Sequence, residues 1–411
     1  MQILVLNSGS SSIKFSIFAV AAHTSSANPQ SLVDGQLSGI GGAESKLTVH
    51  SANGSPQKLA ESTIDTKSLA QAITTVLDTI SATGMPDFQA VGYRVVHPGP
   101  KLHNHQKITT EVLDDLEAAS KFAPLHDPEA LQMIRTVMSR FPNLPHYACF
   151  DTVFHQTMPE EATTYPLPQE YRDRGVRRYG FHGLSCESIV RQLQAHAAVP
   201  KRMAIAHLGS GCSVTALVDG RSVDTTMGLT PTGGIVMGTR PGDLDPGLVL
   251  YLLRQQKQQS EEGVAAVETL LNHASGMVAV SGMANDVKAM RKASDEGNEH
   301  AALALKIFTR SVTKAIGSFC WLLGGLDAIV LAGGIGEHDA QTRSEILDGL
   351  AGLGIDIYRS RNQAGVTGIQ QISSLASRTQ VFVVPAQEDL MIAVHVERME
   401  RQEAREASHV N

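Results

Sequence analysis

The sequence predicts an α/β fold that contains a duplicated domain. The first observation is an internal repeat: residues 3–12 read ILVLNSGSSS and residues 203–212 read MAIAHLGSGC. Each copy has a short apolar strand, one polar residue and a turn of small residues, and each then enters a second strand-like segment. Chance is the alternative, because Gly-Ser turns are common, but strand, turn and strand all match. The second observation is that strands alternate with helical patterns along the rest of the chain, which is typical of α/β proteins.

The individual elements follow from hydrophobic periodicity and from Gly and Pro punctuation. Strands are expected over 13–18, 89–96, 146–150, 213–218, 327–331 and 381–384. Helices are expected over 67–82, 109–122, 128–140, 185–196, 300–323, 339–351 and 387–404. The stretch 24–57 is rich in Ser, Gly, Asn and Gln and predicts loops and irregular edge strands. A domain boundary is expected just after Asp151.

Composition restricts the class of protein. The chain has 411 residues, which suggests two or three domains at roughly 100–200 residues each. Its net charge of −7 has no basic excess that would indicate nucleic acid or anionic lipid as a partner. No run approaches ~18 apolar residues, and the N-terminus lacks a basic leader, so we expect neither a membrane span nor a signal peptide. The four cysteines form no C-x-x-C pair, which predicts buried, reduced thiols in a reducing compartment.

Three Gly-rich turns follow strands, at residues 7–12, 207–211 and 333–337. Such turns let backbone N–H groups approach a polyphosphate closely. Each alone is more often an ordinary tight turn, and none matches a Walker A loop or G-x-G-x-x-G. Because two of the three are related by the repeat, together they predict a nucleotide held between two domains.

Several charged side chains stand at strand ends or in irregular loops. Arg240 lies in MGTRPGDLDPG, a loop too rich in Gly and Pro to be helical, which suits bidentate recognition of an anion. Arg94 in YRVVH is a weaker candidate, because an Arg after a strand is usually a surface or ion-pair residue. His182 in YGFHGLS stands at the start of an expected helix. No H-E-x-x-H pattern occurs, so zinc hydrolysis is not expected.

Carboxylates at strand ends are candidate Mg²⁺ ligands. Asp151 follows one strand, and Glu388 with Asp389 follows another. Mg²⁺ usually takes one or two carboxylates together with water and phosphate oxygens. Helix N-capping is the alternative role for Glu388 and Asp389.

These motifs carry a family resemblance. The chain resembles the acetate kinase family over nearly its whole length, in VLNSGSSSIKF, GYRVVHPG, APLHDP, CFDTVFHQTMP, RRYGFHG, HLGSGCS, MGLTPTGGIVMGTRPGDLDPG, LAGGIGEH and PAQEDL. The resemblance implies the fold of the acetate and sugar kinase, actin and heat-shock chaperone superfamily. That fold has two duplicated actin-like, ribonuclease H-like domains around an interdomain nucleotide cleft. The implied division is residues 1–151 plus 385–411, with a returning C-terminal helix, and a nucleotide-binding domain at 152–384.

The resemblance also implies roles for single residues. Asn7 and Glu388 would hold Mg²⁺, which Mn²⁺ could replace, and Lys14 would reach the ATP phosphates. The expected catalytic residues are Arg94, Asp151, His182 and Arg240. The expected nucleotide contacts are His207, Leu208, Gly209, Ser210, Gly211, Asp286, Val287, Lys288, Gly333, Gly334, Ile335, Gly336 and Glu337. The expected apolar pocket for the methyl group of the acid consists of Val96, Leu125, Phe181 and Pro231.

The chain departs from the family pattern near the nucleotide. Ser210 stands where Asn is usual, Cys212 where Ala is usual, and Lys288 where Arg is usual. Pro98, Pro100 and Pro241 replace small or polar residues. These changes affect expected nucleotide contacts more than the chemistry. Cys212 beside a phosphate loop is either oxidation-sensitive or, as we expect, an inert buried thiol.

The implied reaction is direct in-line phosphoryl transfer between ATP and acetate, giving acetyl phosphate and ADP, by a cytoplasmic homodimer. Three readings compete with it. Propionate kinase is the nearest, since one methylene is worth only ~10–200-fold in discrimination. A sugar or polyol kinase would need polar pocket residues in place of Val96 and Phe181. A chaperone- or actin-like module would act through partners and would turn over ATP without an acid.

Overall fold

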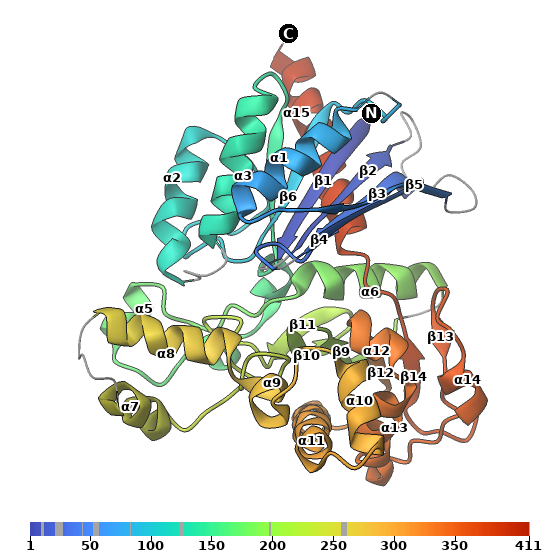
Figure 1. Ribbon diagram of the computed structural model, residues 1–411. Coiled ribbons are helices and arrows are strands. Elements are labelled where there is room, and N and C mark those ends of the chain that lie inside the picture. Colours follow the sequence, from blue (N-terminus) through green and yellow to red (C-terminus); the bar gives the residue numbers. More distant parts are fainter. Residues whose placement is uncertain are drawn as a thin grey trace. The chain divides into compact units, whose positions relative to one another are not determined.

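The computed structural model describes residues 1–9, 12–20, 28–42, 44–51, 57–82, 84–122, 127–196, 199–255 and 261–410. The chain forms two compact units (Figure 1). Unit 1 comprises Met1–Val153 and Gln387–Asn411, and unit 2 comprises Phe154–Ala386. Each unit is built on one β-sheet that is packed against helices. The predicted α/β class is therefore confirmed.

Unit 1 contains a sheet with the strand order β5-β4-β3-β2-β1-β6-β8-β7. Its strands are β1 (Gln2–Gly9), β2 (Ser12–Ala19), β3 (Gln30–Ser38), β4 (Ser45–Ser51), β5 (Gln57–Ile64), β6 (Ala90–Val95), β7 (Gln106–Lys107) and β8 (His146–Phe150). Its helices are α1 (Leu69–Ile80), α2 (Thr110–Ala119), the 3-10 helix η1 (Ser120–Phe122), α3 (Asp127–Arg140) and α15 (Glu388–Val410). Strands β1 and β2 form an antiparallel hairpin, whereas β1, β6 and β8 run parallel.

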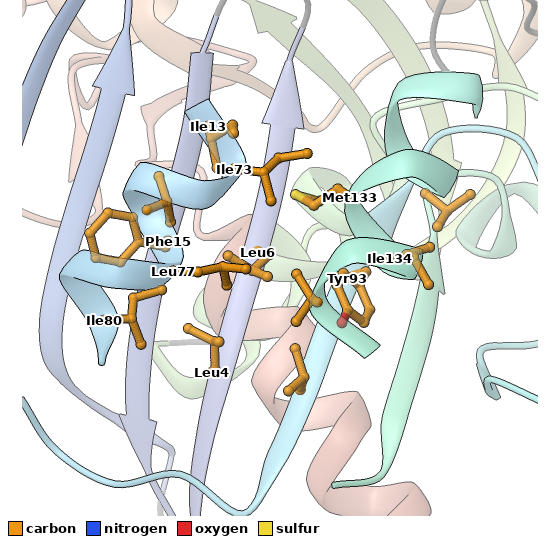
Figure 2. Close-up of a cluster of buried hydrophobic side chains, with 14 of the residues drawn as sticks. Leu4, Leu6, Ile13, Phe15, Ile73, Leu77, Ile80, Tyr93, Met133 and Ile134 are labelled. Atoms are coloured by element: carbon orange, nitrogen blue, oxygen red, sulfur yellow. The ribbon is translucent and has the colours of Figure 1, made fainter. Parts of the chain in front are cut away.

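The two faces of this sheet are buried under different helices. Leu4 and Leu6 alternate along β1 and pack with Ile73 of α1 and Ile134 of α3 (Figure 2). Helix α15 packs on β1 and β6 from the side to which Gly92 points. Helix α1 begins after Ser68, whose side chain accepts a hydrogen bond from the Gln71 N–H and so caps the helix. The C-terminal helix is therefore an integral layer of unit 1.

Gly92 allows α15 to approach the sheet closely. A Cβ at this position would lie 2.7 Å from Cγ2 of Ile392 and 2.8 Å from Cγ2 of Val396. We expect Gly92→Ala to lower the free energy of unfolding by about 1–3 kcal/mol, because the helix must move away from β6. Urea denaturation measures this change. The control is Gly317→Ala in a helix of unit 2, where nothing lies within 4 Å of the new methyl group and a stabilisation is expected. Equal stability of Gly92→Ala and wild type would contradict the prediction.

Unit 2 contains a sheet with the order β11-β10-β9-β12-β14-β13. Its strands are β9 (Arg202–Leu208), β10 (Cys212–Val218), β11 (Arg221–Thr225), β12 (Ala328–Ala332), β13 (Gln370–Gln371) and β14 (Gln380–Val383). Five of these strands repeat the topology of unit 1: β11-β10-β9-β12-β14 corresponds to β3-β2-β1-β6-β8. Both central hairpins are antiparallel, and both first strands pair in parallel with the strand on their other side. The predicted duplication is thus confirmed in the strand order.

The helices described in unit 2 are α4 (Glu160–Thr163), α5 (Gln169–Asp173), α6 (Gly183–His196), α7 (Pro246–Gln255), α8 (Glu261–His273), α9 (Gly276–Ser281), α10 (Val287–Asp295), α11 (Glu299–Leu322), α12 (Gly333–His338), α13 (Ala340–Asp348) and α14 (Arg359–Gln363). Of these, α6, α11 and α12 pack against the strands of the sheet. The 3-10 helices are η2 (Val153–Thr157), which starts at the end of unit 1, and η3 (Ala351–Leu353). Ile189 and Leu193 of α6 pack with Ile205 of β9 and Val330 of β12. Among the described helices, none is long and apolar enough to cross a bilayer.

Two sequence-based expectations were wrong. Most of the stretch 24–57 that is described forms regular antiparallel strands, β3 and β4, rather than irregular edges. Alternate residues such as Leu47 and Val49 are buried there, a pattern that the polar neighbours obscure. Residues 333–337 form the short helix α12 rather than a turn. Gly333 starts it at φ +75°, where a Cβ would lie 2.7 Å from the carbonyl oxygen of Leu208.

Candidate active site

The parallel strands of unit 1 bring three candidate residues to one edge of the sheet. Asn7 lies near the end of β1, Arg94 near the end of β6, and Asp151 directly follows β8. Because these strands are parallel neighbours, their carboxyl ends meet at the same edge. In open α/β sheets this edge is where ligands bind.

Arg94 and Asp151 form a largely buried ion pair. Nε of Arg94 donates to Oδ2 of Asp151 at 3.0 Å, Nη2 donates to the same oxygen, and the Asp151 side chain is 0% exposed. Burial alone lowers the pKa of Arg94, but the negative charges of Asp151 and Glu388 outweigh it and raise the pKa above its ordinary value. Nη1 of Arg94 also donates to Oδ1 of Asn7 at 3.4 Å. The guanidinium group is therefore permanently charged and fixed in orientation.

Two carboxylates at the start of α15 belong to the same group of residues in unit 1. Nδ2 of Asn7 lies 3.4 Å from Oε2 of Glu388 and 3.1 Å from Oδ1 of Asp389, and Asp389 also accepts from Oγ of Ser16 at 3.3 Å. Burial, together with the charge of Glu388, raises the pKa of Asp389, although the Asn7 hydrogen bond lowers it. Two neighbouring carboxylates that repel each other are oxygen donors of the kind that Mg²⁺ takes, so the residues fit this ion.

Asn7 forms hydrogen bonds on both sides of its amide group. Its amide oxygen accepts from Arg94 and its amide nitrogen faces the carboxylates, so in this arrangement it orients both groups. Lys14 pairs with Asn7 across the hairpin and is exposed, and its charge lowers the pKa of Asp389. Metal binding by Asn7 and Glu388 and phosphate binding by Lys14 remain predictions.

Unit 2 holds a second group of candidate residues around His182. His182 directly precedes α6 and has φ +60°, the left-handed region that a non-glycine residue rarely adopts. Its Nδ1 lies 3.0 Å from Oγ of Ser213. Its ring stacks on that of His207 with the centroids 4.2 Å apart, and Nδ1 of His207 lies 2.7 Å from Oγ of Ser185.

The turn between β9 and β10 brings His182 and Arg240 together. A Cβ at Gly211 would lie 3.4 Å from Nε2 of His182 and 3.4 Å from Nη1 of Arg240. Both nitrogen atoms therefore lie beside the same glycine. Nη1 of Arg240 also donates to the carbonyl oxygen of Pro231 at 3.0 Å. An imidazole and a guanidinium beside a Gly-rich turn form an arrangement that can bind a phosphoryl group.

Two of the three segments expected to bind the nucleotide lie at the carboxyl ends of the parallel strands β9 and β12, and the third starts α10. The turn Gly209–Gly211 follows β9 and α12 follows β12, and Gly333 packs on Leu208. The side chain of Asp286 caps α10 by accepting from the Ala289 N–H at 3.0 Å, which leaves Val287 and the exposed Lys288 in its first turn. Oε1 of Glu337 accepts from the Gly333 N–H at 2.9 Å and from the Ala386 N–H at 3.0 Å.

Comparison with known proteins identifies the family. The sequence profile of the Acetokinase family matches residues 2–394. The chain belongs to this family. An acetate kinase of Halothermothrix orenii is 40% identical over 405 residues, which cover 96% of this chain and 98% of the relative. The crystal structure of an acetate kinase of Porphyromonas gingivalis has a TM-score of 0.80 at 32% identity and covers 96% of this chain and 98% of that one. The crystal structure of a propionate kinase of Francisella tularensis has a TM-score of 0.83 at 35% identity and covers 95% of this chain and 98% of that one.

Family membership makes the chain an enzyme, a phosphotransferase with a carboxyl group as acceptor. The structure collects the expected site residues in two groups. Arg94, Asp151, Asn7 and Glu388 contact one another within unit 1. His182, His207, Gly211, Arg240 and Pro231 lie together within unit 2. The apolar pocket stays a prediction: Val96 is half-buried in unit 1, Phe181 and Pro231 are buried in unit 2, and Leu125 lies outside the described residues.

Sequence reasoning missed three side chains that hold the segments expected to bind the nucleotide. Asn285 donates from Nδ2 to Oγ of Ser210 at 3.0 Å. Arg343, 2% exposed, donates to the carbonyl oxygens of Gly336 and Glu337 at 2.9 Å and so holds the end of α12. Arg291 of α10 forms ion pairs with Asp339, between α12 and α13, and with Glu345. None of the three residues lies in a Gly-rich turn. Their supporting role can be recognised only from their contacts in the folded structure.

The four cysteines, all among the described residues, are buried and form no disulfide, as predicted. Cys212 is 0% exposed, and burial raises the pKa of its thiol to about 12. We expect the native enzyme to resist alkylation of Cys212 by iodoacetamide at pH 8, because the thiolate is the reactive form. Mass spectrometry compares native protein with urea-unfolded protein, in which Cys212 should react fully. Rapid labelling of native Cys212 would instead support an oxidation-sensitive thiol.

Proposed function

We propose that this acetokinase reversibly transfers the γ-phosphoryl group of ATP to acetate, giving acetyl phosphate and ADP, with Mg²⁺. The observation that carries the proposal is the pairing of His182 and Arg240 at the Gly211 turn, beside Gly-rich segments suited to polyphosphate. The group of residues in unit 1 supplies a second fixed guanidinium, Arg94. We propose that the groups of unit 1 and unit 2 serve the same reaction.

The chemistry needs charge neutralisation and no general base. Acetate is ionised at neutral pH, since a simple carboxylic acid has a pKa of ~4. The difficulty is the approach of one anion to another. Arg94, Arg240 and His182 are proposed to place positive charge and N–H donors around the equatorial oxygens of the moving phosphoryl group. Asp151, by holding Arg94, would act on orientation and not as a proton acceptor.

Mg²⁺ would be held by Glu388, with Asp389 beside it and Asn7 setting the position of both. When bound, it would supply positive charge to the phosphates of the nucleotide. The intact GGIGE sequence of α12 favours ATP over pyrophosphate, because it places no bulky side chain where adenosine is expected.

Steady-state kinetics with ATP and acetate, propionate or butyrate test this function. The acyl phosphate is trapped with hydroxylamine, so that its formation is seen directly. We expect acetate to be preferred, with propionate accepted within ~10–200-fold, because one methylene in an apolar pocket discriminates no better. The similarity to a propionate kinase makes that acid the second candidate. ATP turnover that yields no acyl phosphate, or that needs a sugar, would reject the proposal.

We also propose that the enzyme is a homodimer. Helix α7 has no buried residue, although its sequence PGLVLYLLRQ is largely apolar, and Leu250 and Tyr251 are 51% and 56% exposed. Such a face would be covered by a second copy. Sedimentation should show two chains for the wild type and one chain for Leu250→Glu/Tyr251→Glu. Lys292→Glu on α10, where the charged side chain is 78% exposed, is the control and should not change the mass. A single-chain mass for the wild type rejects the dimer. We also propose a cytoplasmic location, which the four buried cysteines without a disulfide support.

A further inference from the structure

The backbone of His182 requires support from its surroundings. Among the described residues other than glycine, only His182 and Asp219 have positive φ. For an ordinary L-residue this conformation is rarely populated and persists only where neighbouring groups hold it. The imidazole of His182 faces Gly211 only as long as the turn keeps this shape.

His155 supplies a hydrogen bond directly before His182. It lies in η2, is 1% exposed, and its Nε2 is 2.9 Å from the carbonyl oxygen of Phe181. This carbonyl belongs to the peptide group that joins Phe181 to His182. On the other side of the ring, Nδ1 is 2.9 Å from Oγ of Ser222 in β11.

These contacts define the protonation of the ring. A carbonyl oxygen can only accept, so Nε2 of His155 carries the proton, and Nδ1 accepts from the hydroxyl of Ser222. Burial lowers the pKa of His155 to about 4, so the ring stays neutral at neutral pH. The bond to Phe181 is therefore a permanent feature of the folded enzyme.

The ring of His155 also fixes the turn sterically. Gly180 has φ +75°, and a Cβ there would lie 2.8 Å from the imidazole of His155 and 2.6 Å from Cγ2 of Thr225. The turn thus lies directly against His155 and β11. The hydrogen bond and the packing act on the same residues, Gly180 to His182.

We propose that His155 is a positioning residue that holds the Phe181–His182 peptide and so aims the imidazole of His182 at the Gly211 turn. The inference rests on the proposed role of His182 in phosphoryl transfer. His155 lies in the sequence motif CFDTVFHQTMP, but it is not among the candidate site residues of either unit.

Two amide variants separate the two hydrogen bonds. In His155→Gln the amide reaches the place of Nε2 and can still donate to Phe181, whereas in His155→Asn it reaches only the place of Nδ1 and Ser222. We expect kcat to fall ~10²-fold in His155→Asn, the loss typical of a misplaced catalytic group, with KM for ATP nearly unchanged. The loss in His155→Gln should stay within about 5-fold.

A matched control is available in unit 1. His146 is also buried, and its ring likewise contacts one hydroxyl and one backbone carbonyl. Its Nδ1 lies 2.8 Å from the hydroxyl of Tyr93, and its Nε2 lies 3.1 Å from the carbonyl oxygen of Phe141. His146→Asn should lower the melting temperature without a comparable loss of kcat. If it lowers kcat as much as His155→Asn does, the effect is general destabilisation and the proposal fails.

A double-mutant cycle tests the connection to His182. In a His182→Ala background, His155→Asn should change kcat less than ~2-fold, because a positioning residue has nothing left to position. Additive losses, or equal losses in the Gln and Asn variants, would overturn the proposal. NMR of the His182 ring gives a readout independent of activity: its resonances should move in His155→Asn and not in His146→Asn. If the wild type has no acid-dependent activity, the proposed function fails, and the NMR result alone decides whether His155 positions His182.

Discussion

Replacing Arg240 by alanine should lower kcat ~10²–10³-fold, because a donor aimed at developing charge in a transition state is typically worth about that factor. Nη1 of Arg240 faces Gly211 together with Nε2 of His182. Removing the guanidinium of Arg240 leaves the imidazole of His182 as the remaining member of this pair. Stopped-flow or coupled-assay measurement of kcat in both reaction directions gives the size of the loss.

Arg240→Lys distinguishes charge from geometry. Lysine keeps the charge but not the planar fork, so we expect it to recover only part of the loss. Arg221→Ala is the matched control, because Arg221 is an exposed residue of β11 in the same unit and should leave kcat unchanged. Turnover of Arg240→Ala within a few-fold of wild type would remove Arg240 from the reaction.

The sequence repeat was sufficient to predict the duplicated fold because it lies in the central hairpin of each sheet. Gly9 pairs with Ser12 in unit 1, and Leu208 pairs with Cys212 in unit 2, so each copy lies in an antiparallel strand pair. The neighbouring parallel strands carry short buried runs such as Ala328–Ala332, which hydrophobicity marks clearly. Local pattern and tertiary structure agree in these elements.

The contacts within the candidate site could not be predicted in the same way. Asn7 reaches Glu388 and Asp389 from the opposite end of the chain, and the burial that raises the pKa of Asp389 has no local sequence signal. Arg343 resembles any other helical arginine in the sequence, yet it is buried under α12. Positions next to Gly-rich turns could be predicted, whereas the side chains that hold those turns could not.

The second large effect is expected for Asp151→Asn. The change removes the negative charge that faces the Arg94 guanidinium and leaves that cation in a mostly buried place. Breaking one side of a buried ion pair typically costs about 3–5 kcal/mol of stability. We expect unit 1 to unfold at lower urea concentration. We also expect kcat to fall ~10²-fold, because Arg94 would lose the orientation that its proposed role at the phosphoryl oxygens requires.

A pair of further variants separates the two consequences of this change. Asp327→Asn breaks the ion pair with Arg202, in which both side chains are about a third exposed, and should leave stability and kcat close to wild type. The double variant Arg94→Met/Asp151→Leu removes both buried charges. Much of the stability lost in Asp151→Asn should therefore return, while kcat stays low. Recovery of turnover along with stability in that double variant would mean that Asp151 and Arg94 only support the fold, because a residue that acts on the phosphoryl group cannot be replaced by packing.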